Sequence, residues 1–422
     1  MNAWITPSAT GGSLKAIASK SAAHRLLICA AFSDRETLVR CEEINEDISA
    51  TVRCLSALGA TITREAPFYR VSPVRTLVRN ATLDCGESGS TMRFLVPVAC
   101  MLGADASFLM AGRLPERPLS PLREELERCG IRFSEAGSNP LTCSGTVADT
   151  RFSLAGNVSS QFLSGLLFAL AVSGRTDALR IEGKLESSPY VDLTVDTLSQ
   201  FGICAERTAD GYVIRENTGL RSPGTVEAEG DWSNAAFPLC LGAIGQNPVT
   251  VYGVSARSRQ GDRAIVDLLR RFGAAVTETA NSVTVSPAPL RGIEIDASQI
   301  PDLVPILATV ASVAEGKTVL YNAARLRLKE SDRLMTVSAM LTSLGARVTE
   351  TADGLVIEGV ARLTGGCVSS FGDHRIAMSA AVASAVCDAP LCIERAESAA
   401  KSYPDFWRDM EGLGMKIQTQ SP

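Results

Sequence analysis

The 422-residue sequence is poor in the side chains that bind metals. It has two histidines, His24 and His374, and its twelve cysteines form no Cys-x-x-Cys pair. These scarcities argue against a structural zinc site and against a disulfide framework. We therefore expect no metal site, and we expect most of the thiols to be buried as small hydrophobic groups. We also expect no cofactor.

The chain also lacks long apolar runs and an excess of positive charge. No run reaches the roughly 18 apolar residues that a membrane-spanning helix needs, and residues 1–17 do not resemble a secretory signal. The 41 Lys and Arg residues against 46 Asp and Glu residues leave a net charge of −5, which argues against binding to nucleic acid. We expect a cytoplasmic protein with neither membrane nor nucleic-acid partners.

A repeated pattern covers the whole chain: an amphipathic helix, a glycine and then a short strand. The six copies read LSALGATI, LERCGIRF, LSQFGICA, LRRFGAAV, LTSLGARV and MEGLGMKI. Their glycines lie 69 to 72 residues apart, at Gly59, Gly130, Gly202, Gly273, Gly345 and Gly414. Each glycine stands where a helix ends in a left-handed cap.

A second, more apolar helix is expected about forty residues before each glycine. Because these helices are apolar almost all round, they must be buried, and the amphipathic helices must lie outside them. Each repeat is thus a mixed α/β module, and six modules divide naturally into two domains of three.

The starts of the apolar helices carry the residues of an anion-binding site. They begin near Ser21, Ser88, Ser160, Ser233, Asp302 and Asp373. Free N–H groups and the helix dipole attract anions there, although ordinary helix capping is the alternative explanation. Lys20, Arg25 and Arg375 oppose the dipole at these starts, which favours a bound phosphate or carboxylate.

Three further segments place charged groups at related points of the repeats. The proline-rich loop GRLPERPLSPLR contains Arg117, and guanidinium groups grip carboxylate or phosphate in bidentate fashion. LRLKESDR contains Lys329, Glu330 and Arg333, and ESAAKSYPDFW contains Lys401. Taken alone, the first of these two runs is also typical of a solvated helix face.

The motifs together resemble those of the enolpyruvyl transferases, and most closely the branch that acts on shikimate 3-phosphate. The matching segments are SKSAAHR (19–25), ESGSTMR (87–93), RLPERP (113–118), SSQF (159–162), SSPY (187–190), IPD (300–302), LKESDR (328–333), DHR (373–375) and AAKSYPDF (399–406). They follow the family's order over nearly the full chain.

The resemblance implies an α/β fold of two globular domains. Each domain would contain three repeated βαβαββ-type units, with buried inner helices whose N-termini face an interdomain cleft. One domain would comprise 19–229, and the other 1–18 plus 230–422, with hinge strands near 18–20 and 229–231. We expect a monomer.

The implied reaction transfers the enolpyruvyl group of phosphoenolpyruvate to the 5-hydroxyl of shikimate 3-phosphate, with release of phosphate by addition and elimination. It belongs to the shikimate pathway of aromatic amino acid biosynthesis, the target of glyphosate. By resemblance, Asp302 is the candidate base for the hydroxyl. Glu330 and Lys20 are the candidates for proton transfer at the methylene carbon and for charge stabilisation.

The resemblance also assigns binding residues. Those for shikimate 3-phosphate would be Ser21, Arg25, Ser159, Ser160, Gln161, Ser187 and Lys329. Those for phosphoenolpyruvate would be Lys20, Gly89, Arg117, Arg333, Arg375 and Lys401.

The sequence departs from the family pattern at three places. Ile17 and Ala18 replace a usual Pro-Gly, Ser90 replaces Thr, and Glu87 replaces Asn. A carboxylate beside an anionic ligand is repulsive unless it points away or pairs with an arginine.

Two alternatives remain open at this point. The sister transferase that acts on UDP-N-acetylglucosamine usually has a reactive cysteine in the proline-rich loop, whereas this chain has none between Cys100 and Cys129. A non-catalytic, clamp-like scaffold would also suit a six-fold repeat, but it would spread its basic residues along one face and bind DNA in a salt-dependent way.

Overall fold

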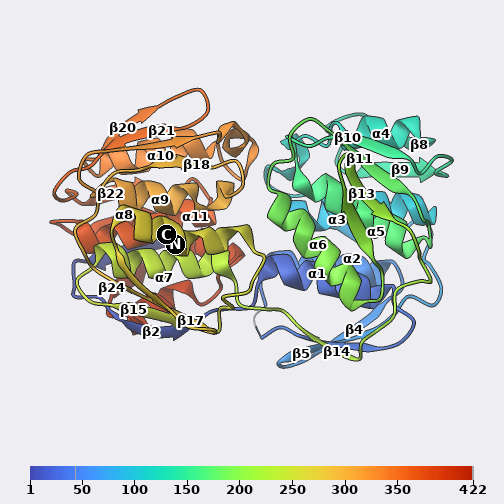
Figure 1. The fold of residues 1–422 in the computed structure, drawn as a ribbon, viewed down its shortest axis with the longest axis horizontal. Coiled ribbons are helices and arrows are strands. Elements are labelled where there is room, and N and C mark those ends of the chain that lie inside the picture. Colours follow the sequence, from blue (N-terminus) through green and yellow to red (C-terminus); the bar gives the residue numbers. More distant parts are fainter. Residues whose placement is uncertain (43, 421–422) are drawn as a thin grey trace. The chain divides into compact units, whose positions relative to one another are not determined.

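The computed structural model describes residues 1–42 and 44–420 (Figure 1). The chain forms two compact units, and each is described by itself. The C-terminal unit comprises Met1–Ile17 and Glu229–Pro422, and the inserted unit comprises Ala18–Ala228. Each unit has a hydrophobic core of its own. The hinge role of the linking segments stays a prediction.

The strands are short, as expected for a chain of small repeated sheets. Their bounds are β1 (Asn2–Thr6), β2 (Gly12–Lys15), β3 (Thr37–Arg40), β4 (Thr61–Glu65), β5 (Phe68–Ser72), β6 (Thr82–Asp84), β7 (Ser107–Leu109), β8 (Ile131–Phe133), β9 (Leu141–Gly145), β10 (Phe152–Ala155), β11 (Ala178–Glu182), β12 (Ala205–Thr208), β13 (Gly211–Ile214), β14 (Thr225–Glu227), β15 (Val249–Tyr252), β16 (Ala275–Glu278), β17 (Ser282–Ser286), β18 (Glu294–Asp296), β19 (Lys317–Tyr321), β20 (Arg347–Glu350), β21 (Leu355–Glu358), β22 (Gly366–Ser369), β23 (Leu391–Glu394) and β24 (Lys416–Gln420).

Within the described residues these strands form six four-stranded sheets of one topology. In the sheet β10-β11-β13-β12, the first two strands are parallel, and an antiparallel hairpin continues from the second. The same pattern recurs in β14-β3-β5-β4, β6-β7-β9-β8, β2-β15-β17-β16 and β18-β19-β21-β20. In β22-β23-β1-β24 the strand directions are the same, but the last two strands come from opposite ends of the chain and form no hairpin. The predicted α/β fold of repeated units is confirmed.

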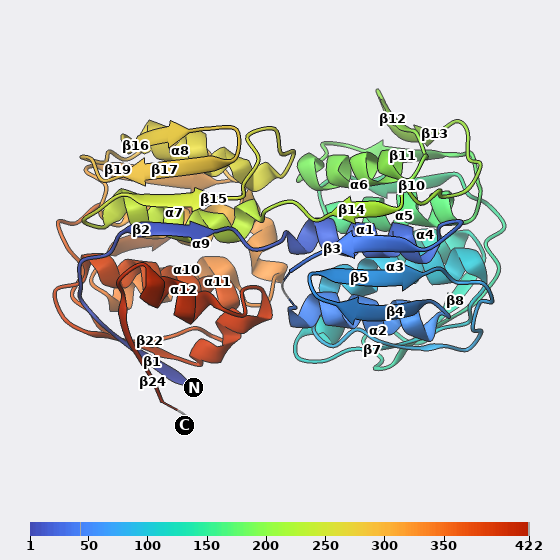
Figure 2. The same ribbon diagram turned by 90° about the horizontal axis from the view of Figure 1, so that it is seen from below.

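Three of the sheets take in a strand from a distant part of the chain. In the C-terminal unit, β1 lies between β23 and β24, and β2 pairs in parallel with β15 (Figure 2). In the inserted unit, β14 pairs in parallel with β3. The pairings of β1 and β2 explain why the first 17 residues belong to the C-terminal unit.

The helices fall into the two predicted classes. The inner helices are α1 (Lys20–Ala31), α3 (Gly89–Leu102), α5 (Ser160–Val172), α7 (Trp232–Ile244), α9 (Val304–Ala311) and α11 (His374–Ala383). The outer helices are α2 (Glu46–Ala57), α4 (Leu122–Arg128), α6 (Ser188–Gln200), α8 (Ile265–Phe272), α10 (Arg333–Ser343) and α12 (Phe406–Gly412). Short 3₁₀ turns are η1 (Leu114–Glu116), η2 (Gly261–Ala264), η3 (Pro301–Leu303), η4 (Ala324–Leu328), η5 (Ser384–Val386) and η6 (Ala396–Lys401).

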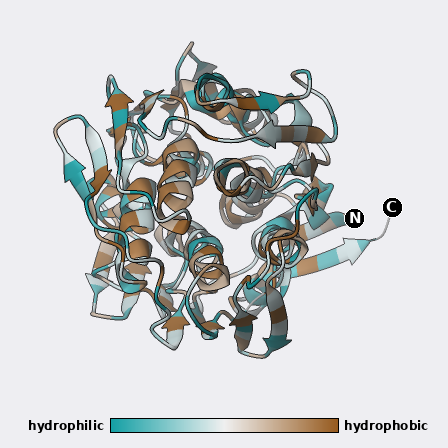
Figure 3. Cartoon of the chain, turned by 90° about the vertical axis from the view of Figure 1, so that its right-hand side faces the viewer, coloured by the Kyte–Doolittle hydropathy of each residue, from teal (hydrophilic) through white to brown (hydrophobic). Residues whose placement is uncertain are grey.

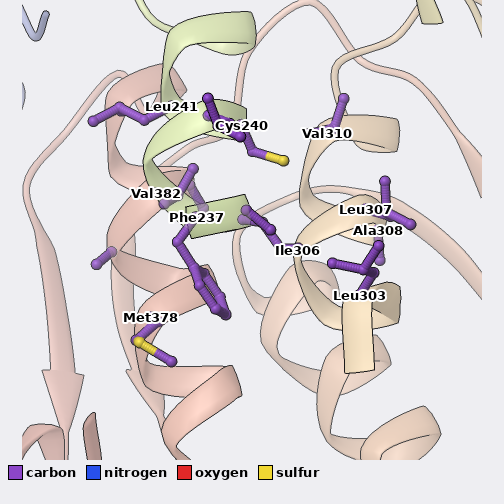
Figure 4. Packing of buried hydrophobic residues seen from close by; sticks show 14 of the residues in the cluster. Phe237, Cys240, Leu241, Leu303, Ile306, Leu307, Ala308, Val310, Met378 and Val382 are labelled. Carbon is purple, nitrogen blue, oxygen red and sulfur yellow. The ribbon is translucent and has the colours of Figure 1, made fainter. Parts of the chain in front are cut away.

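The inner helices build the cores. Nearly every residue of α5 and α11 is buried, and the brown, hydrophobic segments in Figure 3 gather on central helices. In the C-terminal unit, Phe237 of α7, Ile306 of α9 and Met378 of α11 belong to one cluster of buried side chains (Figure 4). Burial of such apolar surface is the main stabilising term of each unit.

The repeat glycines have the predicted backbone. All six lie at positive φ, between 82° at Gly202 and 113° at Gly59, which side chains other than glycine rarely adopt. Each closes its outer helix and directs the chain into the next strand. Across the described part of the chain, we find no helix with the length and apolar character needed to cross a membrane.

Candidate active site

In the C-terminal unit, one buried arginine joins three carboxylates. Arg333 begins α10, and its side chain is only 1% exposed. It donates from Nη1 to Asp302 Oδ1 at 2.9 Å and from Nη2 to Glu330 Oε2 at 2.8 Å. It also donates from Nε to Asp373 Oδ2 at 2.8 Å. The starts of α9, α10 and α11, from two neighbouring repeats, are therefore connected through one guanidinium group.

Asp302 lies among three cations. Besides Arg333, Lys329 Nζ lies 3.5 Å from Asp302 Oδ1, and Arg375 Nη2 lies 3.5 Å from Oδ2. Burial alone would raise the pKa of Asp302, but Arg375, Lys329 and Arg333 together hold it well below its usual range. The carboxylate is therefore ionised at neutral pH.

Arg333 likewise stays charged at neutral pH. Burial by itself would lower the pKa of its guanidinium group, but attraction to Asp373, Glu330 and Asp302 raises it above its ordinary value. Asp373 also caps α11, because its Oδ1 accepts a hydrogen bond from the backbone N–H of Arg375 at 2.9 Å. Here capping and arginine pairing are performed by the same carboxylate.

A further acid, Asp262, was missed by the sequence analysis. It is buried in η2, and its Oδ2 accepts a short hydrogen bond from Ser233 Oγ, which in turn accepts one from Arg375 Nη2 at 3.2 Å. Burial and repulsion from Asp302 raise the pKa of Asp262 to about 6. The signal that could have found it is the Gly-Asp-Arg run before α8, which parallels the Ser-Asp-Arg run before α10.

Lys401, the remaining predicted residue of this unit, lies next to a residue that contacts α7. Lys401 is buried at the end of η6, and the carbonyl of the adjacent Ser402 lies 3.5 Å from Asn234 Nδ2 in α7. Asp231 caps α7 by accepting a hydrogen bond from the backbone N–H of Asn234 at 2.8 Å. Asp231 thus has the geometry of an ordinary helix cap.

In the inserted unit, the first turns of α3 and α5 are joined by amide and hydroxyl groups. Arg93 Nη1 donates to Gln161 Oε1 at 3.1 Å, and Gln161 Nε2 donates to Ser90 Oγ at 2.9 Å. Ser159 caps α5 by accepting a hydrogen bond from the backbone N–H of Gln161 at 3.3 Å, and Ser160 is buried beside it. The structure thus joins the predicted Gln161 to Ser90 and Arg93, two residues that the sequence analysis did not assign to the site.

Gly89 gives two guanidinium groups access to the start of α3. A Cβ atom at Gly89 would lie 2.6 Å from Arg93 Nη1 and 3.0 Å from Arg117 Nη1. Any side chain would therefore push at least one of these arginines away. Arg117 can hold this position only because residue 89 has no side chain.

Lys20 pairs with an acid that the sequence analysis did not single out. Its Nζ lies 2.7 Å from Asp47 Oδ2 in the first turn of α2. The backbone carbonyl of Asp47 accepts a hydrogen bond from Thr91 Oγ1 at 3.3 Å. The starts of α1, α2 and α3 are thereby linked, with the ammonium group held in one place.

The guanidinium group of Arg25 donates three hydrogen bonds to residues of the inserted unit. Its Nε donates to Thr194 Oγ1 at 2.8 Å, Nη2 donates to the Tyr190 carbonyl at 2.7 Å, and Nη1 donates to the Ser21 carbonyl at 2.6 Å. Burial lowers the pKa of Arg25 to about 10. The guanidinium braces α1 against the start of α6, where Ser187 adopts a positive φ of 54°. A direct role of Arg25 in ligand binding stays a prediction.

Glu87 packs against the proline-rich loop. A Cβ atom at Gly112, which has a φ of 54°, would lie 2.5 Å from Glu87 Oε1. The carboxylate therefore covers the backbone just before Arg113 and Arg117. A side chain at position 112 would collide with the Glu87 carboxylate, so the contact requires glycine there.

Comparison with known proteins identifies the family. The family model of EPSP synthase (3-phosphoshikimate 1-carboxyvinyltransferase) matches residues 6–410. The chain belongs to this family. Two curated relatives with the name 3-phosphoshikimate 1-carboxyvinyltransferase agree with the match. That of Clostridium kluyveri is 41% identical over 99% of this chain and 98% of its own, and that of Clostridium acetobutylicum is also 41% identical, with the same coverages.

Solved structures confirm the fold. EPSP synthase from Acinetobacter baumannii matches with a TM-score of 0.82 and 24% identity, over 99% of this chain and all of that one. The enolpyruvyl transferase NikO from Streptomyces tendae matches with a TM-score of 0.78 and 20% identity, over 100% of this chain and 99% of that one. Family membership confirms the predicted transferase and does not favour the nucleotide-sugar or scaffold alternatives.

Proposed function

We propose that the protein transfers the enolpyruvyl group of phosphoenolpyruvate to the 5-hydroxyl of shikimate 3-phosphate and releases inorganic phosphate. The observation that carries this proposal is the ionised Asp302 among Arg333, Arg375 and Lys329. A base in such surroundings suits a reaction between two anions, because the cations attract the substrates while the carboxylate accepts a proton.

Phosphoenolpyruvate would be held by side chains that can pair with its carboxylate and phosphate groups. In the C-terminal unit these are Arg333, Arg375 and Lys401. In the inserted unit, Lys20 and Arg117 add positive charge, and Gly89 allows close approach of the backbone. Bidentate guanidinium contacts match planar carboxylate and phosphate oxygens.

Shikimate 3-phosphate would be held mainly by neutral donors. The proposed contacts are Ser21, Arg25, Ser159, Ser160, Gln161, Ser187 and Lys329. Ser159, Ser160 and Gln161 support this assignment because they gather at the N-terminus of α5, where backbone N–H groups and the helix dipole favour a phosphate.

The proposed reaction has two steps, an addition and an elimination, and each step moves protons. In the addition, the 5-hydroxyl oxygen bonds to C2 of phosphoenolpyruvate, its proton passes to Asp302, and C3 receives a proton. In the elimination, the bond between C2 and the phosphate oxygen breaks, and C3 gives up a proton. Glu330 and Lys20 are the proposed groups for the steps at C3. Binding of two anions would offset the cations around Asp302 and raise its pKa, making it a stronger base.

The decisive experiment measures phosphate release from phosphoenolpyruvate with shikimate 3-phosphate, against a parallel reaction with UDP-N-acetylglucosamine. We expect release only with shikimate 3-phosphate, unchanged by a metal chelator. Release only with the nucleotide sugar would overturn the substrate assignment, and release with neither would overturn the activity. We further propose that the protein is a cytoplasmic monomer without nucleic-acid partners, which sedimentation of the purified protein and salt-dependent DNA binding would test.

A further inference from the structure

Cysteines of this chain lie together in pairs. Among the described residues, neighbouring thiols occur at Cys54 with Cys85, Cys100 with Cys143, and Cys367 with Cys392. All four thiols of the first two pairs are buried. The third pair differs, because Cys367 is exposed to solvent. An oxidant in solution can therefore reach only this pair without opening a core.

Cys367 and Cys392 occupy paired positions on adjacent parallel strands. Cys367 lies on β22, the edge strand of its sheet, directly opposite Cys392 on β23. Paired residues on neighbouring strands point to the same face, so the two thiols lie side by side. Neighbouring strands lie about 4.8 Å apart, within the Cα separation of about 4.4–6.8 Å that disulfides span.

The pair lies on the outer face of the sheet. The alternate residues Val368 and Ile393 are buried in the core, so Cys367 and Cys392 point the other way. On that outer face, Cys392 has Trp4 of β1 as its other cross-strand neighbour. Trp4 is 43% exposed, whereas Cys392 is 2% exposed. Cys392 is thus reached through Cys367 rather than directly from solvent.

We propose that Cys367 and Cys392 form a modification site at which a hydroperoxide produces an intrachain disulfide. The Cys367 sulfur attacks the peroxide O–O bond, forming a sulfenic acid and releasing one water molecule when hydrogen peroxide is the oxidant. The Cys392 sulfur then attacks the Cys367 sulfur, the S–S bond forms, and the sulfenic hydroxyl leaves with the Cys392 proton as a second water. Two thiols lose two electrons, and the peroxide is reduced to two waters.

The environments of the two sulfurs support this order of events. Burial and the neighbouring thiol raise the pKa of Cys392 to about 12, so this group stays protonated at neutral pH. Exposed Cys367 is consequently the sulfur that meets the oxidant first. Cys392 lies directly opposite on β23, so it is the thiol placed to attack the sulfenic acid before further oxidation, and it loses its proton in that step.

Cys204 provides an internal comparison. It is the other exposed cysteine, in the segment between α6 and β12, and it belongs to none of the three pairs. Its sulfenic acid would lack a cross-strand thiol partner of the kind that Cys392 provides to Cys367. Under the same treatment, Cys204 should therefore advance to the sulfinic acid, whereas Cys367 should stop at the disulfide.

The test treats the folded full-length protein with hydrogen peroxide, blocks the remaining thiols by alkylation and maps the peptides without reduction. We expect a Cys367–Cys392 linked peptide that dithiothreitol releases, in the wild type and in Cys204→Ser. Cys367→Ser should abolish the link. Cys392→Ser, or Cys392→Ala if the first variant folds poorly, should convert Cys367 to a sulfinic acid.

The outcomes that would overturn the proposal are equally definite. Sulfinic acid at Cys367 in the wild type, without the linked peptide, would show that Cys392 does not resolve the sulfenic acid. Equal oxidation of Cys204 and Cys367 to the same product would show that pairing has no effect. A linked peptide that forms only after denaturant is added would show that the folded sheet cannot accommodate the bond.

Discussion

The charged clusters of the two units use the same repeat differently. In the C-terminal unit, Arg333 pairs with the carboxylates of Asp302, Glu330 and Asp373. In the inserted unit, Arg93 instead contacts the neutral amide of Gln161. Carboxylates can accept and release protons at moderate pH, whereas amides only form hydrogen bonds. The difference predicts that the hydroxyl proton is taken up in the C-terminal unit, where Asp302 and Glu330 lie, while Lys20 is the proposed proton-transfer group of the inserted unit.

The largest expected effect comes from Asp302→Asn. The amide keeps the shape of the side chain but cannot accept the hydroxyl proton, so kcat should fall by roughly 10²- to 10⁴-fold. Steady-state phosphate release measures this. Asp267→Asn, at an exposed carboxylate on α8, is the matched control and should leave kcat unchanged. A fall of similar size in both variants, or in neither, would contradict the role of Asp302.

Asp373→Ala should be the most damaging change to stability. It leaves the buried Arg333 without its two hydrogen bonds to Asp373, at 2.8 and 3.2 Å. Leaving a buried charge uncompensated typically costs about 3–5 kcal/mol, and the loss here should lie toward the lower end because Arg333 keeps Asp302 and Glu330. The free energy of unfolding of the wild type and of Asp373→Ala, from urea titrations, measures this loss. The parallel change Gln161→Ala removes a neutral partner of Arg93 and should cost clearly less, and equal losses would remove the distinction between the units.

His24 of the inserted unit should make stability depend on pH. Its pKa is lowered to about 3 by burial, from 6.5 in an unfolded chain. Below pH 6.5 the unfolded state therefore binds a proton that the folded state excludes, and this contribution to stability is lost as pH falls toward 3. Relative to His24→Asn, the wild type should lose stability from pH 6.5 to pH 4 in urea titrations, and parallel curves would exclude this role.

Asp262 of the C-terminal unit should give a slope of the opposite sign. Its folded-state pKa is raised to about 6 from 3.8, so the folded state binds a proton more tightly than the unfolded state. This contribution is fully present below pH 3.8 and is lost as pH rises through 6. Relative to Asp262→Asn, the wild type should gain stability as pH falls from 6 to 4. The same titrations test this, and a slope of the same sign as for His24 would contradict it.

The smallest effect is expected from Gly89→Ala. The new methyl group would displace the ends of Arg93 and Arg117, which are flexible and can adjust. We expect a loss of about 1 kcal/mol in binding, or about fivefold in the KM for phosphoenolpyruvate. The KM for shikimate 3-phosphate and the unfolding midpoint are the controls. If the larger change is in the KM for shikimate 3-phosphate, the assignment of Gly89 and Arg117 to phosphoenolpyruvate binding is wrong.

Much of the fold was predictable because its signals are local. The left-handed caps at Gly59 and Gly273 follow from the end of an apolar stripe within the same few residues. Asp262 and Asp47 were not predictable in this way. Asp262 meets Ser233 from 29 residues along the chain, and Asp47 meets Lys20 from 27 residues away. Nothing in either local pattern specifies the partner.

The sequence by itself determined the six-fold repeat, the burial of the inner helices and the residue types at their starts, since periodicity and capping act over a few residues. Only the tertiary structure decided which carboxylate meets which cation. Arg333 and Asp373 are 40 residues apart in the chain, and the depressed pKa of Asp302 arises from Arg375, Lys329 and Arg333 together. Electrostatic interactions depend on distance in space and on burial, and both are set by packing rather than by sequence separation.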